Sequence, residues 1–438
     1  MKQLIRKIVD AIIQIVLKTV ENRHLNLHPK RHLGGRLSIM QKKRIARGVK
    51  RFFDQYYELR FNILKQSEEF RPRSSGEAPG FASEVAGFEH QAPPADQGWR
   101  PLTERELQRI SFEQMERVGV AWSIDVEHYV RSTLTPDYNP VADYLDHCGA
   151  WTPQTDHIRA LARRVPTSYE AWPDLFHRWF LAMVAQWQHL NPDHGNAIVP
   201  MLIGGQGTHK STFCRLLLPP ELRAYYIDDV KLDNAEQVER MLCRMLLVNI
   251  DEYNAKTDRE QAKIKRILTE RDVQTRRMRS DRYEQLPRMA SFIATTNDRQ
   301  PLFDPTGSRR YLCCELDGII DTDTPIDYRQ LYAQAVDELR RGAPYYFSKA
   351  EERAVEHHNE TYRMEVSAET LLLTYYEPAP RHLDNFLLAT EIQQELARHV
   401  RAVDLPSLKK LTLALRQCSF AHGAINGRRG WYGRRLQL

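Results

Sequence analysis

A glycine-rich run that ends in lysine and serine is the part of the sequence best suited to chemistry. It follows the apolar run 198–203 and comprises Gly204, Gly205, Gln206, Gly207, Thr208, His209, Lys210, Ser211 and Thr212. Glycines let backbone N–H groups converge on phosphate, a lysine can reach the β- and γ-phosphates, and a hydroxyl can hold Mg²⁺. We therefore expect a phosphate-binding loop for ATP, with Ser211 as a ligand of Mg²⁺.

The loop departs from the usual pattern G-x-x-x-x-G-K-[ST] at one position. His209 stands where a glycine normally precedes the lysine. A side chain at this point puts the shape of the loop and its contact with phosphate in question. The alternative interpretation is an ordinary strand, turn and helix with a chance Lys-Ser pair.

Two carboxylates follow a second apolar run, 245–250, where a nucleotide site needs them. An apolar strand closed by Asp251 and Glu252 is the Walker B pattern. Asp251 would hold Mg²⁺, directly or through water, and Glu252 would polarise the attacking water. The sequence thus predicts that two strands contribute to one site.

A third strand, expected at 290–296, ends at Asn297, whose amide could orient water against the γ-phosphate. Arg309 and Arg310 follow a turn and suit the charge that spreads over a transferred phosphoryl group. Each motif taken alone could be a buried strand end, a turn or a solvated arginine pair. Together they occur in the order and spacing that an oligomeric ATPase needs.

The motifs resemble those of the virulence-associated protein E family, predicted helicase-type ATPases of phages, plasmids and integrative elements. That family is related to the superfamily 3 helicases of the AAA+ class. The resemblance is carried by four segments, 204–212, 249–253, 290–297 and 304–310. It implies an α/β P-loop ATPase core that drives DNA unwinding or translocation in replication of a mobile element. It also implies a ring, a hexamer in related helicases, in which Arg309 or Arg310 acts on the neighbour's ATP.

An arginine-rich interval, 275–288, separates the second and third strands. In superfamily 3 helicases this interval carries a hairpin that grips one DNA strand in the central channel. Arginines bind phosphates and an aromatic residue can stack a base, so we expect contact with single-stranded or forked DNA. The expected contacts are Arg276, Arg277, Arg279 and Arg282. The alternative is a sheet-edge hairpin kept soluble by its charge.

Composition indicates a globular protein of two or three domains, since the chain has 438 residues, of which 27% are charged. A net charge of +6 is compatible with nucleic acid. The six cysteines are scattered without metal-ligand spacing, so we expect reduced core thiols in a bacterial cytoplasm and no structural zinc. They are Cys148, Cys214, Cys243, Cys313, Cys314 and Cys418.

The N-terminal part is basic. Residues 1–22 have helical periodicity but are too short and too charged to span a membrane; a core helix, a surface helix and a dimerising helix remain open. Between 23 and 51 ten Lys and Arg residues occur without an acid, which suits either phosphate backbones or a solvated face. Nothing here has the bulk of the primase module that family members often carry, so priming would need another chain.

The remaining chain divides by composition. Thr103 should cap a helix, and Ser407 should cap the second of two helices that precede an Asn426-Gly427 hairpin, a pattern typical of a winged helix. The expected domains are a basic helical segment at 1–70, a disordered linker at 71–100, a helical module at 101–190, the P-loop core at 191–345 and a winged-helix-like domain at 346–438.

Two other function classes remain open. One is a non-hydrolysing DNA-binding or assembly protein with a degenerate loop, for which His209 is the main support. The other is a nucleotide-dependent defence or regulatory switch that hydrolyses ATP without unwinding DNA. The retained Glu252 and arginine pair favour the motor.

Overall fold

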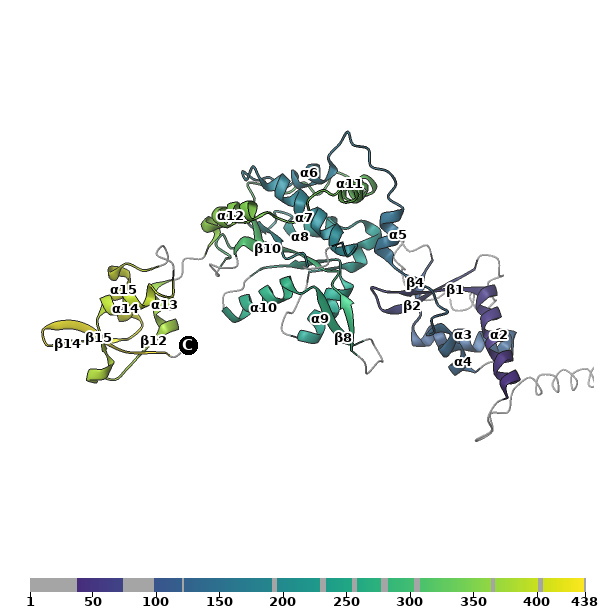
Figure 1. The fold of residues 1–438 in the computed structure, drawn as a ribbon, viewed down its shortest axis with the longest axis horizontal. Helices are drawn as coiled ribbons and strands as arrows, with labels where there is room; N and C mark the ends of the chain where they lie inside the picture. The colour runs from purple at the N-terminus through teal and green to yellow at the C-terminus, as the bar shows by residue number, and fades with distance from the viewer. Residues whose placement is uncertain are drawn as a thin grey trace, which may run out of the picture.

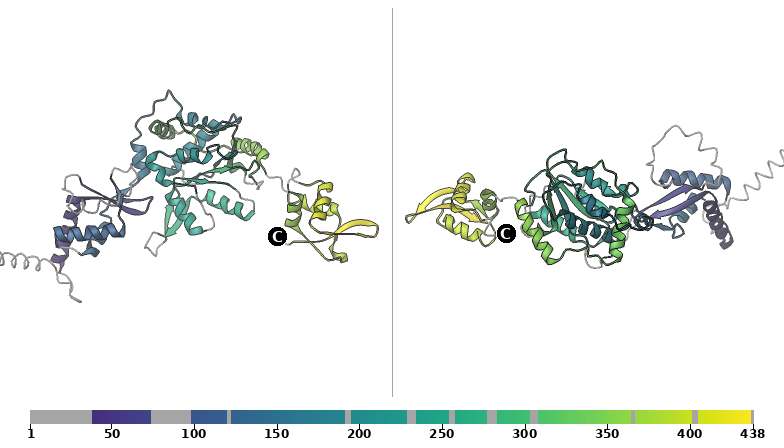
Figure 2. Two further views of the ribbon diagram at one scale, coloured as in Figure 1. Left: turned by 180° about the vertical axis from the view of Figure 1, so that it is seen from behind. Right: turned by 90° about the horizontal axis from the view of Figure 1, so that it is seen from above.

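The computed structural model describes residues 38–73, 98–119, 122–190, 195–228, 234–253, 258–276, 283–302, 308–363, 367–400 and 405–436. The helix expected at 1–22, most of the linker expected at 71–100, and Arg277, Arg279 and Arg282 lie outside these residues. Figure 1 shows the described elements as three lobes in a row, and the two further views in Figure 2 show the same three lobes.

The N-terminal lobe packs three helices against a small sheet of order β3-β2-β1-β4. Its core joins Val49, Phe52 and Phe53 of the first helix to Phe70 and Ile110. The elements are α2 (Ile39–Tyr56), β1 (Tyr57–Asn62), β2 (Ser67–Pro72), β3 (Arg100–Pro101), α3 (Glu104–Arg117), α4 (Ser123–Val130) and β4 (Asp137–Tyr138). Thr103 caps α3 as expected, accepting from the Glu106 backbone N–H.

A five-stranded parallel sheet of order β11-β5-β10-β7-β6 forms the centre of the second lobe. Both faces are buried, which explains why its strands read as nearly continuous apolar runs. The strands are β5 (Val199–Ile203), β6 (Tyr226–Ile227), β7 (Leu247–Ile250), β10 (Ser291–Thr296) and β11 (Tyr311–Glu315). The expected mixed α/β fold with a parallel sheet is confirmed.

Helices cover both faces of this sheet. Trp172, Phe176 and Phe213 belong to the core on one face, whereas Met241 and Leu268 belong to the core on the other. The helices are α5 (Pro140–Asp146), α6 (His157–Ala162), α7 (Trp172–Trp187), α8 (Lys210–Leu216), η1 (Pro220–Tyr225), α9 (Ala235–Arg244), α10 (Asp258–Thr269), η2 (Ser308–Arg310), α11 (Tyr328–Arg340), α12 (Lys349–His358) and η3 (Asn359–Tyr362). A hairpin of β8 (Asp272–Arg276) and β9 (Tyr283–Pro287) precedes β10.

The C-terminal lobe has its own core around Leu372, Leu411 and Trp431. Its elements are α13 (Ala368–Tyr375), β12 (Tyr376–Pro378), η4 (Leu383–Asn385), β13 (Phe386–Leu387), α14 (Ala389–Leu396), α15 (Leu408–Gln417), β14 (Ala421–Ile425) and β15 (Arg428–Arg435). Ser407 caps α15, and Asn426 and Gly427 turn β14 into β15 with positive φ angles, as an Asn-Gly hairpin requires.

The elements within 101–190 do not share one core. Ile110 and Val126 pack in the N-terminal lobe, whereas Trp172 and Trp179 pack against the central sheet. The strand β1 lies within the segment 1–70 that was expected to be helical, and β2 runs from that segment to Pro72, inside the linker expected at 71–100. Both strands contain polar residues that pair with each other. Arg60 of β1 forms an ion pair with Glu69 of β2, whose side chain is only 1% exposed. Within the described ranges, no helix is both long and apolar enough to cross a membrane.

Candidate functional site

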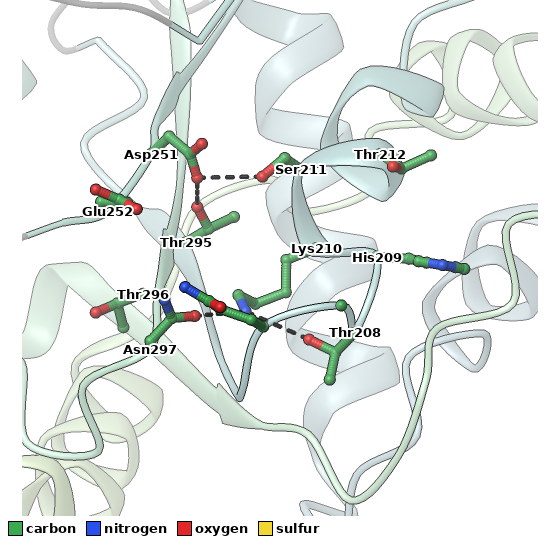
Figure 3. Close-up of a pocket in the computed structure, with 12 residues that line it drawn as sticks. Thr208, His209, Lys210, Ser211, Thr212, Asp251, Glu252, Thr295, Thr296 and Asn297 are labelled. Atoms are coloured by element: carbon green, nitrogen blue, oxygen red, sulfur yellow. Dashed lines mark hydrogen bonds between the residues drawn. The ribbon is translucent and has the colours of Figure 1, made fainter.

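The carboxyl ends of three neighbouring strands create the site. β10 lies between β5 and β7, and all three run parallel. The glycine loop leaves β5, Asp251 leaves β7 and Asn297 leaves β10, so all three reach the same edge of the sheet, where open α/β sheets bind ligands. The backbone N–H of Gly204 donates to Thr296 O at 3.1 Å and joins the loop to β10. Residues 206–212 of the loop, Asp251, Glu252 and residues 295–297 line a cavity of about 300 Å³ (Figure 3).

Lys210 is the central cation of this cavity. Its Nζ donates to Gly204 O and Gly205 O at 2.7 Å each, and to Asn297 Oδ1 at 3.0 Å. Only 9% of the residue is exposed, and this burial lowers the pKa of the ammonium while the nearby Asp251 raises it. Neutral oxygens thus hold the ammonium in place without neutralising it, which leaves its charge available for an anion.

Three oxygen-bearing side chains meet beside the lysine. Ser211 Oγ donates to Asp251 Oδ1 at 3.1 Å, and the Thr295 hydroxyl donates to the same carboxylate oxygen. Among the described residues, no three His, Cys, Asp or Glu side chains gather around a common point. Ser211 and Asp251 still fit Mg²⁺, because that ion prefers hard oxygen donors and often takes only one or two from protein, with phosphate and water completing its shell.

Glu252 adopts an unusual backbone conformation at the edge of the cavity. Its φ is +51°, in the left-handed region that residues other than glycine avoid. Neighbouring contacts hold the turn: Tyr253 N donates to Thr295 O at 2.8 Å, and Tyr253 OH donates to Tyr311 OH at 2.9 Å. The turn keeps the Glu252 carboxylate among the groups that line the cavity, exposed and beside Asp251 (Figure 3). Such strain is often kept where function needs it.

His209 stands where the usual pattern has a glycine, and its backbone lies in the left-handed region that glycine favours. Its φ is +63°, and its exposed ring points away from Lys210 and Asp251 in Figure 3. The ring Nδ1 lies 3.3 Å from Thr322 Oγ1, in the segment after β11. The side chain therefore leaves the space between the lysine and the carboxylates open.

Arg309 and Arg310 lie at the opposite edge of the sheet. They precede β11, whose first residue, Tyr311, pairs with Val199 at the amino end of β5. Because the five residues of β11 span about 16 Å at ~3.3 Å each, neither arginine is near Lys210 of its own chain. They help line a second cavity of about 210 Å³, where Arg309 contacts Glu352 at 3.4 Å.

Arg276 ends β8 and pairs in register with Tyr283 of β9, so the expected hairpin is present.

Thr295 was missed by sequence reasoning, although it directs its hydroxyl to Asp251. A signal existed: Thr295 and Thr296 are the only consecutive polar pair in an otherwise mainly apolar run, next to Asn297. Thr322 had no such signal, since its contact with His209 depends on the fold alone.

Comparison with known proteins identifies the family. Residues 145–364 match the model of the virulence-associated protein E-like domain, which is half of the chain. The chain belongs to this family. The VapE-like segment runs from the end of α5 through η3, and so contains both cavities and both arginines. No curated protein matches the chain.

Solved structures similar to this VapE-like chain include the apo structure of the NrS-1 C-terminal region (305–718), with a TM-score of 0.42 and 12% identity over 89% of this chain and 99% of that one. The A-form apo structures of the same region give TM-scores of 0.39 and 0.37 at 13% identity. Each covers 88% of this chain, and 97% and 98% of the other chains respectively.

Proposed function

We propose that this chain is an ATPase that drives DNA translocation or unwinding in replication of a mobile genetic element. The observation that carries the proposal is the meeting of Lys210, Ser211 and Asp251 in one cavity at the carboxyl edge of the sheet. A buried cation, a hydroxyl and a carboxylate, beside a glycine loop, are the groups that a Mg²⁺–triphosphate requires. The family to which the chain belongs supports the mobile-element setting.

Within the cavity the residues have distinct tasks. Lys210 would exchange its contacts with Gly204 and Gly205 for phosphate oxygens, since those carbonyls hold it less strongly than an anion does. Ser211 and Asp251 would hold Mg²⁺, which neutralises charge on the phosphates when bound. Thr295 would fix the Asp251 carboxylate through its hydroxyl.

Hydrolysis also needs a water molecule held in line with the γ-phosphate. Glu252, exposed at the cavity rim, would accept a proton from that water. Asn297 would orient the same water or the γ-phosphate with its amide nitrogen, since its carbonyl oxygen already accepts from Lys210. The ring of His209 points away from Lys210 (Figure 3), which favours hydrolysis over the alternative of a degenerate loop.

The position of the two arginines supports a ring of subunits. They lie at the amino edge of the sheet, where their own nucleotide cannot reach them, but where a neighbouring subunit's nucleotide could. In such a ring one subunit's arginine would stabilise charge on the phosphate held by the next subunit. DNA would pass along the β8–β9 hairpin that carries Arg276.

ATP hydrolysis with and without single-stranded DNA tests the proposal. Wild type is expected to turn over ATP faster with DNA, whereas Lys210→Ala and Glu252→Gln lose at least about 100-fold, the scale expected for removing a transition-state group. Lys349→Ala and Glu170→Gln, at exposed positions outside the cavity, serve as matched controls. Wild-type turnover no faster than that of Lys210→Ala would reject the proposal, and a forked duplex that stays paired despite DNA-stimulated turnover would favour a switch.

A further inference from the structure

The outer face of α2 carries a row of cations that the proposed ATPase site does not use. The buried side of this helix consists of Ile45, Val49, Phe52 and Phe53. On the exposed side lie Lys42, Lys43, Arg44, Arg47, Lys50 and Arg51, which we call the outer face of α2. Within the part of the chain that the structure describes, only Lys50 of these six is paired with a carboxylate, that of Asp54 at 2.7 Å.

Helix stability does not explain this arrangement. Lys43, Arg47 and Arg51 are spaced four residues apart, so like charges stand next to one another along the helix, which is unfavourable. The first turn has no acid to complement the helix dipole. In the neighbouring α3, by contrast, Arg109 and Arg117 are paired with Glu113. The outer face of α2 therefore holds uncompensated positive charge that a polyanion could neutralise.

The packing of α2 favours nucleic acid over a membrane surface as the partner of its outer face. A helix that binds a membrane surface inserts its apolar side into the lipid, but the apolar side of α2 is already packed in the core of the lobe. Exposed apolar residues occur in the first turn, Ile39 and Met40, whereas the exposed side from Lys42 to Arg51 is dominated by cations. The exposed side also offers no aromatic ring, whereas binding of single strands usually depends on stacking of bases on such rings. These features favour contact with the phosphates of a duplex.

We propose that the outer face of α2 binds the phosphate backbone of duplex DNA without reading its sequence. From Lys43 to Arg51 the helix rises about 12 Å at ~1.5 Å per residue, which matches three to four phosphates of one strand at about 3.4 Å of helix axis each. This inference rests on the proposed motor function and extends it, because the N-terminal lobe would bind duplex DNA that has not yet been unwound. Binding of the duplex does not require hydrolysis of ATP.

The test is the salt dependence of binding, measured by fluorescence anisotropy with a 20-base-pair duplex and full-length protein without nucleotide. The triple variant Lys43→Gln, Arg47→Gln, Arg51→Gln removes the row, and glutamine keeps the helix because its helix propensity is similar. Loss of three phosphate contacts should reduce the slope of log K against log salt by about 2.7. Raising salt from 50 to 200 mM would then cost wild type about 40-fold more affinity than it costs the variant.

Matched controls make the outcome specific. The variant Arg163→Gln, Arg340→Gln, Lys349→Gln removes three exposed cations of the central lobe and should leave the slope unchanged. Equal slopes for wild type and the α2 variant, or an equal change in the control variant, would overturn the proposal. The proposal would also be overturned if the α2 variant lost binding to phosphatidylserine vesicles but still bound the duplex like wild type. Because nucleotide is absent, Lys210→Ala should bind the duplex like wild type, so a failed motor function is told apart from a failed DNA contact.

Discussion

Replacement of the buried Arg288 should destabilise the central lobe more than any single surface change. Arg288 follows β9 and is 0% exposed. Its Nε donates to Ala290 O at 2.7 Å, and its two terminal nitrogens donate to Leu268 O and Asn196 O at 2.8 Å each. Two longer bonds reach Glu270 O at 3.1 Å and Ile267 O at 3.2 Å. One guanidinium thus ties the end of α10 to the segments before β5 and β10.

The magnitude follows from two opposing contributions. The two hydrogens of Nη1 are shared among three carbonyls, so the five contacts amount to about four hydrogen bonds from a charged donor, worth roughly 2 kcal/mol each and about 8 kcal/mol together. Complete burial disfavours the charged form and lowers the pKa of Arg288 to about 9, well below its ordinary value, which corresponds to a cost of about 5 kcal/mol. Arg288→Met removes both contributions, so the net loss of unfolding free energy should be about 3 kcal/mol, within the range for breaking a buried charged network.

The assay is urea unfolding of the full chain, followed by tryptophan fluorescence, together with hydrogen exchange at 258–270. Trp172, Trp179 and Trp187 report on the core of the central lobe. Arg288→Lys should retain part of the stability, because an ammonium can satisfy two or three of the carbonyls. Arg340→Met is the matched control at an exposed helical position. If Arg288→Met unfolds within about 0.5 kcal/mol of that control, a surface-like effect, the network contributes nothing net and the reasoning is refuted.

Three further outcomes follow from the site. His209→Gly should hydrolyse ATP within about threefold of wild type, because glycine adopts the same positive φ without a cost of about 1 kcal/mol; a tenfold loss of kcat would mean that the contact with Thr322 shapes the loop. Of Arg309→Ala and Arg310→Ala, the variant that lacks the arginine acting between subunits should be inactive alone. Mixing it with inactive Lys210→Ala should restore turnover, because the Lys210→Ala subunit supplies the arginine to an intact pocket, and no restoration would contradict that role. Burial lowers the pKa of Lys210, so its ammonium should lose its proton at lower pH than an ordinary lysine does. Nucleotide affinity, measured by titration, should therefore fall as pH rises towards 10. An affinity that does not change with pH would show that the charge of Lys210 is not needed.

Apolar runs made the central sheet predictable. Three strands expected at 198–203, 245–250 and 290–296 are present as β5, β7 and β10, because a parallel sheet buried on both faces leaves few polar positions. Ser407 as a helix cap and Asn426-Gly427 as a hairpin turn were also predictable, since each depends on local backbone chemistry. The positions of Lys210, Asp251 and Asn297 were predictable for the same reason: these residues follow closely on the ends of those strands.

Features that depend on distant contacts were not predictable. The strands β1 and β2 have no apolar run, and their stability comes from pairs such as Arg60 with Glu69. The order of the central strands, which inserts β10 between β5 and β7, cannot be read from any one segment. The same order is what brings Thr295 to Asp251, so the support of that carboxylate was hidden as well.

In the proposed ring, the separation of Lys210 from the arginine pair would make an isolated subunit incomplete. Each polypeptide holds a pocket at one edge of its sheet and, at the other, the cations that would complete the pocket of a different molecule. Turnover per polypeptide should then rise steeply with protein concentration and fade on dilution. At low protein concentration the proposed ATPase would then stay inactive until copies assemble, and binding of several copies to one DNA molecule would promote that assembly.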